Sequence, residues 1–438
     1  MVLRRSIPAC LVACLLQLLA GGSIGSVAGS GAQETAADSG KPSDGRGDTR
    51  AHSQENQRMR LRLTVAASGC ERHDKPVEVN LNLTQVRKQL GLQGTANDIP
   101  IRVEDVNAAG TVEDARVLFQ FDRAKPSGAA TTTSGTLVFL LKGNTPADGI
   151  RYFDVYFGPR SPEKAASKSA SLVSLEDGGE YEGEPSFKIV TPTATCFYHK
   201  RGSGFASLVD KDGNDWISYH PKGGFEGDFR GIPNLAPADF HPGRGQGHRE
   251  SEIVSSGPLK VTILSETQDG KWGCTWEIYP NCARMTLFKK GGEPYWILYE
   301  GTPGGRFDAE TDFWVNSAGE RFPAMPYTQK NVWHGRLPDP QWVYFGDTKL
   351  KRVLYFALHE PDDVVDEFWH RGSGGMTVFG FGRGPQKDGW RRMTTLPAHL
   401  TIGFAETDEF AQISRLVNSA YREVKVSVGQ PEGPTRDK

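Results

Sequence analysis

The sequence has almost no excess charge of either sign and no long apolar run. Its 438 residues contain 51 Lys and Arg against 53 Asp and Glu, which gives a formal net charge of −2. Proteins that bind nucleic acid normally need a basic surface to neutralise phosphates, so the composition does not favour a nucleic-acid partner. The most apolar stretch, residues 7–20, is shorter than the roughly 20 residues that span a bilayer. We therefore predict no membrane span.

Several well-known catalytic motifs are also missing. The sequence has no G-x-S-x-G elbow, no phosphate-binding P-loop, no HExxH and no kinase signature, so esterase, nucleotide hydrolase and zinc protease chemistries are unsupported. No CxxC or compact Cys/His spacing indicates zinc. The glycine-rich run 376–383 is not a dinucleotide fingerprint, because no βαβ pattern surrounds it. We interpret its glycines as allowing a strand to approach a neighbour or a ligand closely.

What the chain does have begins with an export signal. Arg4 and Arg5 precede the apolar run, and small residues at 26–28 offer a cleavage site, which is the layout of a secretory signal peptide over residues 1–28. We therefore expect a secreted or periplasmic protein. The tetrapeptide ending at Cys14 also resembles a lipoprotein box, which leaves anchoring at Cys14 as the less favoured alternative.

Cleavage would leave four cysteines, Cys70, Cys196, Cys274 and Cys282. An even number of cysteines can pair in an oxidising compartment. Because Cys274 and Cys282 flank a Tyr-Pro-Asn turn, we predict a disulfide across this hairpin. Pairing of Cys70 with Cys196 is a second, less favoured option.

The first half of the mature chain indicates a linker and a small domain. Residues 29–58 contain almost no large apolar side chain and are expected to be disordered. Over residues 59–158, about six short runs with apolar residues at every second position indicate antiparallel strands. We predict an immunoglobulin-like β-sandwich there. A second segment of low apolar content, at 159–182, is expected to link it to the next domain.

The second half has a different composition. All nine tryptophans and eight of the ten histidines lie between positions 199 and 399. Strand-like runs dominate, so we predict a large antiparallel β-sandwich over residues 183–427, followed by a flexible tail at 428–438. The fold class is therefore mainly β with few helices. Helical patterns are expected only at 83–90, 361–369 and 407–421.

The polar and aromatic residues concentrate in 216–250, a segment with no obvious regular structure. Loops of that length inside a compact domain are commonly functional, although such a loop can also be a hydrogen-bonded cover over a sheet. One chemistry that fits is β-elimination on a uronate polysaccharide, which needs a base and donors that neutralise the sugar carboxylate. The candidate bases are Tyr219, His241 and His248, and the candidate neutralising residues are Arg230, Arg244 and Arg249. Substrate binding is assigned to Asn234, Trp216, Asp228 and Glu300.

Other chemistries stay open. Glycoside hydrolysis needs two carboxylates, for which the candidates are Glu226, Asp228, Glu250, Glu277 and Glu300. Glu300 stands out because it ends an apolar strand-like run and precedes a glycine-rich turn. No metal or other cofactor is expected. Calcium is the alternative cofactor. Asp239, His241 and His248 are possible metal ligands, although their spacing matches no compact metal motif. A helix face bearing His359, Asp362, Asp366 and His370 would suit calcium or zinc, but helix capping and dipole complementation are the favoured explanation of that set.

The layout of export signal, linker, small sandwich and tryptophan-rich sheet domain resembles secreted bacterial carbohydrate-active β-sandwich proteins, such as polysaccharide lyases and glycoside hydrolases. Residues 295–301 and 227–234 look like the site-forming segments of such proteins. The resemblance implies an enzyme that degrades a polysaccharide, with β-elimination slightly favoured over hydrolysis. A noncatalytic glycan-binding or cell-surface protein is the alternative from another class.

Overall fold

The computed structural model describes residues 59–89, 100–124, 134–157, 171–245, 247–372 and 374–433. The export signal, Cys14 and the predicted linker at 29–58 lie outside these ranges. Within them the protein is mainly β, as predicted, and the α-helices are α2 (Leu83–Gln89), α3 (Gly224–Phe229) and α4 (Phe410–Tyr421). No helix in these ranges is long and apolar enough to cross a membrane.

Two sheets enclose the core of the N-terminal region. One has the strand order β26 (Lys425–Val428), β1 (Met59–Ala66), β7 (Ile150–Phe157), β3 (Ile101–Val106) and β4 (Val112–Asp114). The other has the order β2 (Arg72–Asn82), β6 (Ser134–Thr145) and β5 (Phe119–Arg123). Alternate residues such as Leu61, Leu63 and Val65 are buried between them, which explains the period-two pattern. The immunoglobulin-like connectivity and the division into domains stay predictions.

Two nine-stranded antiparallel sheets form the rest of the described protein. The first, called the site sheet below, has the order β20 (Trp333–Gly335), β23 (Asp366–His370), β24 (Thr377–Phe381), β17 (Trp296–Gly301), β12 (Gly231–Ala236), β11 (Gly204–Asp210), β10 (Ala194–His199), β9 (Glu184–Val190) and β8 (Ser174–Tyr181). The second, the back sheet, has the order β13 (Glu252–Ser256), β14 (Val261–Glu266), β15 (Gly273–Ile278), β16 (Ala283–Lys289), β25 (Ala398–Ala405), β22 (Val353–Leu358), β21 (Trp342–Asp347), β18 (Asp312–Asn316) and β19 (Arg321–Pro323). Short 3-10 turns lie at Pro303–Gly305 and Gln386–Asp388.

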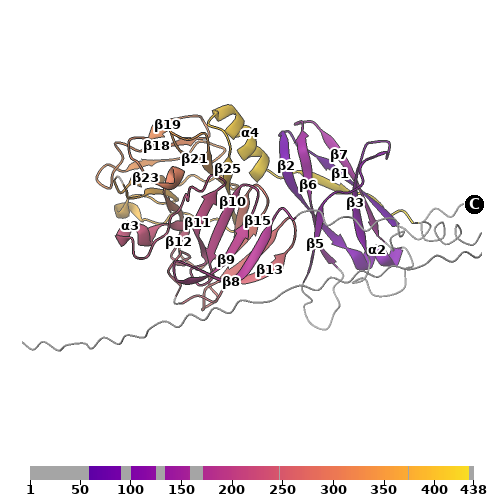
Figure 1. Ribbon diagram of the computed structural model, residues 1–438, viewed down its shortest axis with the longest axis horizontal. Coiled ribbons are helices and arrows are strands. Elements are labelled where there is room, and N and C mark those ends of the chain that lie inside the picture. The colour runs from indigo at the N-terminus through magenta and orange to yellow at the C-terminus, as the bar shows by residue number, and fades with distance from the viewer. Residues whose placement is uncertain are drawn as a thin grey trace, which may run out of the picture. The chain divides into compact units, whose positions relative to one another are not determined.

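The two large sheets share one apolar core, which contains side chains such as Trp276, Tyr299, Phe356 and Phe379. The other face of the back sheet is covered by α4, whose Ile413 and Val417 join a second cluster with Trp342 and Tyr355 (Figure 1). The predicted helix at 407–421 is thus confirmed. The outer face of the site sheet carries a different set of side chains, described below.

Two local predictions were wrong. Residues 361–369 form no helix, because 366–370 form β23. This strand is buried on both faces, so its sequence shows no alternation that would separate it from a short helix. The segment 216–250 is not an irregular loop throughout, since it contains α3 and β12.

The predicted cross-hairpin disulfide is also wrong, since all four described cysteines are free. In the β15–β16 hairpin Cys274 lies opposite Leu287, whereas Cys282 lies in the turn beyond the last strand pair, Ile278 with Ala283. Cys274 faces the large core and Cys282 a separate small cluster. The two cysteine side chains therefore lie in different hydrophobic clusters.

The thiols are expected to be unreactive in the folded protein. Burial raises the pKa of both Cys196 and Cys274 to about 12, so little thiolate forms at neutral pH. Titration with a thiol reagent should count the thiols only after denaturation, and a reducing agent should leave the melting temperature unchanged. Fast labelling without denaturant, or a lower melting temperature on reduction, would contradict the free, buried state.

Candidate functional site

The candidate site is built on β17, at the centre of the site sheet. Successive side chains of a strand point to opposite faces. Ile297 and Tyr299 enter the core, so Trp296, Leu298 and Glu300 lie on the outer face. Of these three residues, only Glu300 has a titratable side chain. It lies near the end of the strand, where the sequence pattern had placed it.

Strand register adds residues from three neighbouring strands. Glu300 lies opposite Val378 of β24, which lies opposite Trp369 of β23. Because Glu367 precedes Trp369 by two residues, it shares the outer face. On the other side Asn234 of β12 donates its amide to the Glu300 carboxyl. A carboxyl, an amide, a second carboxyl and an indole therefore share one surface.

Two arginines close over this surface. Arg383 lies over the rings of Trp296, Trp369 and Trp390, with its guanidinium carbon 5.0, 6.0 and 5.5 Å from the ring centroids. Gly380 makes room for it, since a Cβ there would lie only 2.8 Å from the Cβ of Arg383. This agrees with the close approach predicted for the glycines of 376–383.

Arg371 approaches from the other side. It follows β23, and its guanidinium carbon lies 4.2 Å from the ring centroid of Phe225 and 5.1 Å from that of Trp369. Phe225 itself is 53% exposed, so this arginine–aromatic pair reaches the surface. Stacked guanidinium groups keep their hydrogen-bonding edges available to an anion.

The environment of Glu300 favours its neutral form. The residue is 4% exposed, and burial raises the pKa of its carboxyl to about 7. The amide of Asn234 opposes that shift, and so do the charges of Arg383, Arg371 and Arg244. A carboxyl with a pKa near neutrality can both accept and donate a proton at physiological pH, as general acid–base catalysis requires.

Several donors at the site have no hydrogen-bond acceptor within the described part of the chain. They are the Nε atoms of Arg371 and Arg383 and the indole Nε1 of Trp296. The Glu367 carboxylate lies 3.4 Å from the Arg383 Nε, but it accepts its hydrogen bond from the indole Nε1 of Trp369. Buried donors without acceptors are rare, and a ligand with oxygen atoms would satisfy them.

Among the three bases predicted from 216–250, His241 is the one that contacts Glu300. Its Nε2 is 3.9 Å from the Glu300 carboxyl and 2.9 Å from the carbonyl of Phe229. The residue is 1% exposed, and burial lowers the pKa of the ring, which favours neutral imidazole. The structure thus brings together Glu300, Asn234, His241 and Arg244, all four predicted.

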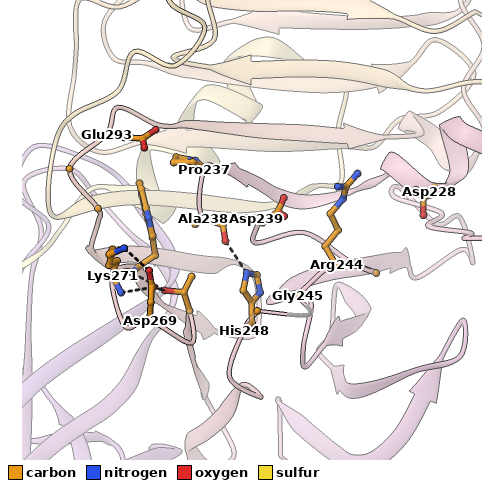
Figure 2. A pocket seen from close by; sticks show the side chains of 16 residues that line it. Asp228, Pro237, Ala238, Asp239, Arg244, Gly245, His248, Asp269, Lys271 and Glu293 are labelled. Carbon is orange, nitrogen blue, oxygen red and sulfur yellow. Dashed lines mark hydrogen bonds and ion pairs between the residues drawn. The ribbon is translucent and has the colours of Figure 1, made fainter.

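The other predicted bases lie in tight packing. Tyr219 is 2% exposed, packs edge-on to His199, and has its hydroxyl against Gly243; burial raises its pKa to about 12. His248 places both ring nitrogens within hydrogen-bond distance of backbone carbonyls. One is the carbonyl of Arg201, and the other is that of Ala238 (Figure 2). Action of either as a base would require these contacts to open. Their catalytic role stays a prediction.

The remaining predicted residues are held by local contacts. Trp216 is fully buried, and its indole donates to Asp210. Arg230 donates to the backbone carbonyls of Ser218, Gly374 and Gly375, and Arg249 pairs with Glu266. Asp228 lies in a groove beside Arg244. Their assignment to the reaction is untested.

Sequence reasoning missed Glu367, Trp369, Arg371 and Arg383. The first two were assigned to a helix, and the arginines come from loops more than 65 positions beyond Glu300. The one available signal was the glycine alternation before Arg383.

The two metal-binding alternatives find no matching geometry in the part of the chain that the structure describes. No group of three or more His, Cys, Asp or Glu side chains in the described ranges could hold a metal ion. The set on the supposed helix 361–369 is separated, because 366–370 form a strand. His359 bonds Thr401, and His370 accepts from the amide of Gly372.

Stability should fall as pH rises from about 6.5 to 8. Burial raises the carboxyl pKa of Asp312 to about 8 and those of Glu300 and Asp366 to about 7, all above the ordinary values of unfolded chains. Between the unfolded and the folded pKa, the folded state holds a proton that the unfolded state releases. The free energy of unfolding therefore falls by up to about 1.4 kcal/mol per group and pH unit, until the pH passes the folded pKa. Buried histidines such as His359, with a lowered pKa, act in the opposite direction only below about pH 6.5.

Urea unfolding at several pH values measures this dependence. Asp312→Asn keeps the side-chain shape and should flatten the slope. An equal slope in the variant, or rising stability in the parent, would contradict the role of Asp312.

Comparison with known proteins identifies no family. No protein-family profile and no curated protein matches the chain. Similar solved structures include a glycosyl hydrolase family 38 protein from Enterococcus faecalis (TM-score 0.41, 11% identity, covering 85% of this chain and 47% of that one). Another is a galactose mutarotase related enzyme from Lactobacillus acidophilus (TM-score 0.35, 10% identity, covering 51% of this chain and 99% of that one). A third is an alpha-galactosidase from Lactobacillus brevis (TM-score 0.32, 11% identity, covering 55% of this chain and 42% of that one).

By name these are carbohydrate-active proteins. All three TM-scores are below 0.5, so the similarity carries no argument about this chain.

Proposed function

We propose that this protein is a carbohydrate-active enzyme that binds an acidic sugar of a polysaccharide on the outer face of the site sheet. In this proposal Glu300 is the proton-transfer group. The observation that carries the proposal is the arrangement of Glu300 and Asn234 on adjacent strands, beneath two arginines stacked on aromatic rings.

Each part of that arrangement suits a uronate sugar. Arg371 and Arg383 offer donors with the planar geometry that matches a carboxylate. Trp390 is 41% exposed and packs against Trp296, so an indole edge is available for contact with a sugar ring. Asn234 holds the Glu300 carboxyl in place through its amide.

The reaction favoured by this chemistry is β-elimination. Glu300 removes the proton from the carbon next to the sugar carboxylate, and the released electron pair forms a carbon–carbon double bond. The bond from the adjacent carbon to the glycosidic oxygen breaks. The departing oxygen takes up the proton from the Glu300 carboxyl, which returns to its ionised form. The two arginines stabilise the charge that develops on the sugar carboxylate.

Glu367 supports glycoside hydrolysis as the second candidate. It is another buried carboxyl on the same face, two strands from Glu300. Inverting hydrolases need two carboxyls separated by about 6.5–9.5 Å, so that one protonates the leaving oxygen and the other activates water. Glu277, by contrast, is paired with Lys260 and Arg284.

One assay separates these reactions. Purified protein is incubated with a panel of acidic and neutral polysaccharides, while unsaturated product is followed by ultraviolet absorbance and new reducing ends are counted. Elimination produces both signals, and hydrolysis produces reducing ends alone. Binding without either signal would indicate the noncatalytic glycan-binding alternative, and neither binding nor product would refute the proposal.

We also propose export, on the strength of residues 1–28. Amino-terminal sequencing of protein recovered from outside the cytoplasm should find the chain starting near residue 29. A lipid-modified Cys14 would support the anchored alternative, and an intact Met1 in cytoplasmic protein would contradict both.

A further inference from the structure

A groove of about 950 Å³ lies beside the site. It is bordered by the turn that follows β12. Figure 2 shows Arg244 and Asp228 towards one end and Glu293, Asp269 and Lys271 towards the other, with Asp239 between them. This volume is at the upper end of the range for small-molecule sites, about 300–1,000 Å³, so it is large for a single sugar.

Contacts connect the lining of the groove with the Glu300 surface at both ends. At one end Arg244 stacks on Phe229, whose carbonyl contacts His241, and His241 is 3.9 Å from Glu300. At the other end the Glu293 carboxylate pairs with Arg391, and the backbone of Arg391 forms an isolated antiparallel β-bridge with that of Arg383. A polymer with one sugar at Glu300 can therefore place neighbouring sugars in the groove.

The charges in the groove differ from those around Glu300. Asp269 pairs with Lys271, and Glu293 pairs with Arg391. Asp228 and Asp239 make no hydrogen bond or ion pair through their carboxylates with any part of the chain that the structure describes. Such carboxylates accept hydrogen bonds from hydroxyl groups and repel the carboxylate of another sugar.

We propose that this groove binds neutral sugars of the same polysaccharide chain, next to the acidic sugar held at Glu300. The inference rests on the proposed function and specifies its substrate class. The substrate then combines acidic and neutral sugars. The cation Arg244 lies at the Asp228 end of the groove, where its charge also acts on Glu300, so further along the groove the next carboxylate of a uronate homopolymer would face Asp239 (Figure 2).

Two polymers test this in the Glu300→Gln background, in which the ligand is not consumed. Hyaluronan alternates an acidic with a neutral sugar, whereas polygalacturonate is acidic throughout. Calorimetric titration should show hyaluronan binding at least about tenfold tighter, roughly 1.4 kcal/mol. Asp239→Asn should reduce that ratio by strengthening the binding of polygalacturonate.

A blocking variant tests the place of binding. Gly292 lines the groove, and a Cβ there meets nothing within 4 Å, so Gly292→Tyr starts a bulky side chain from open space at the groove. We expect it to weaken hyaluronan binding about tenfold. Gly179→Tyr on β8, at an equally open glycine, is the matched control and should leave binding unchanged.

The outcomes separate this inference from the proposed function. Equal or tighter binding of polygalacturonate, or no effect of Gly292→Tyr, would overturn the inference and leave an acidic-glycan enzyme. If neither polymer bound, the inference would be wrong. If no polymer of the full panel bound or reacted either, the proposed function would be wrong as well.

Discussion

Glu300→Gln is expected to lower turnover by about 100- to 10,000-fold, the usual cost of losing a positioned acid or base. Glutamine keeps the shape of the side chain and can still contact Asn234, but it cannot take up a proton from the substrate. It also removes a buried ionisable group, so the melting temperature at neutral pH should stay the same or rise. Initial rates on the polymer identified by the panel, together with thermal unfolding, measure both effects.

Asp312→Asn is the matched control for this variant. Asp312 is a buried carboxyl with a raised pKa, but it belongs to the back sheet. Its replacement should leave turnover unchanged. Full activity in Glu300→Gln would show that Glu300 is a structural carboxyl, and the catalytic assignment would be wrong.

Arg383→Met is expected to lower turnover by about 100- to 1,000-fold, the range seen when one charge-stabilising donor is removed. Methionine preserves part of the apolar stem above Gly380 and can still pack against the tryptophans. Loss of the positive charge should also raise the Glu300 pKa further, because Arg383 now lowers it. The acid side of the pH–rate profile should therefore move to higher pH.

This shift distinguishes a role in the reaction from a role in packing alone. Arg321→Met is the control, since Arg321 stacks on Phe313 of the back sheet, away from Glu300. It should change neither the rate nor the profile. A slower Arg383→Met enzyme with an unshifted profile and lowered stability would count against the charge argument.

Alternation of apolar and polar residues predicted some strands of this protein and missed others. Alternation at Leu61, Leu63 and Val65 predicted a strand with one face buried, and the structure contains it as β1. The same rule failed at β23, where both faces are buried and Glu367 and Trp369 have no exposed neighbours to set a period. Reading a strand from its sequence needs a contrast between its two faces, and a strand buried on both faces offers none.

The disulfide prediction failed for a related reason. A turn between Cys274 and Cys282 was visible, but the pairing register was not. Register decides which residues lie opposite each other, and here it places Leu287 across from Cys274. Hydrophobic packing on both sheets sets that register, not the turn residues alone.

By itself the sequence determined that this is a mainly β protein, because alternation and turn residues are local properties of the chain. It also indicated Glu300, because a carboxyl ending an apolar strand and followed by glycines is a local pattern. Only the tertiary structure decided which groups surround Glu300. Asn234, Glu367, Arg371 and Arg383 reach it through strand pairing between distant segments, and the burial that raises the pKa of Glu300 exists only once those segments have packed together.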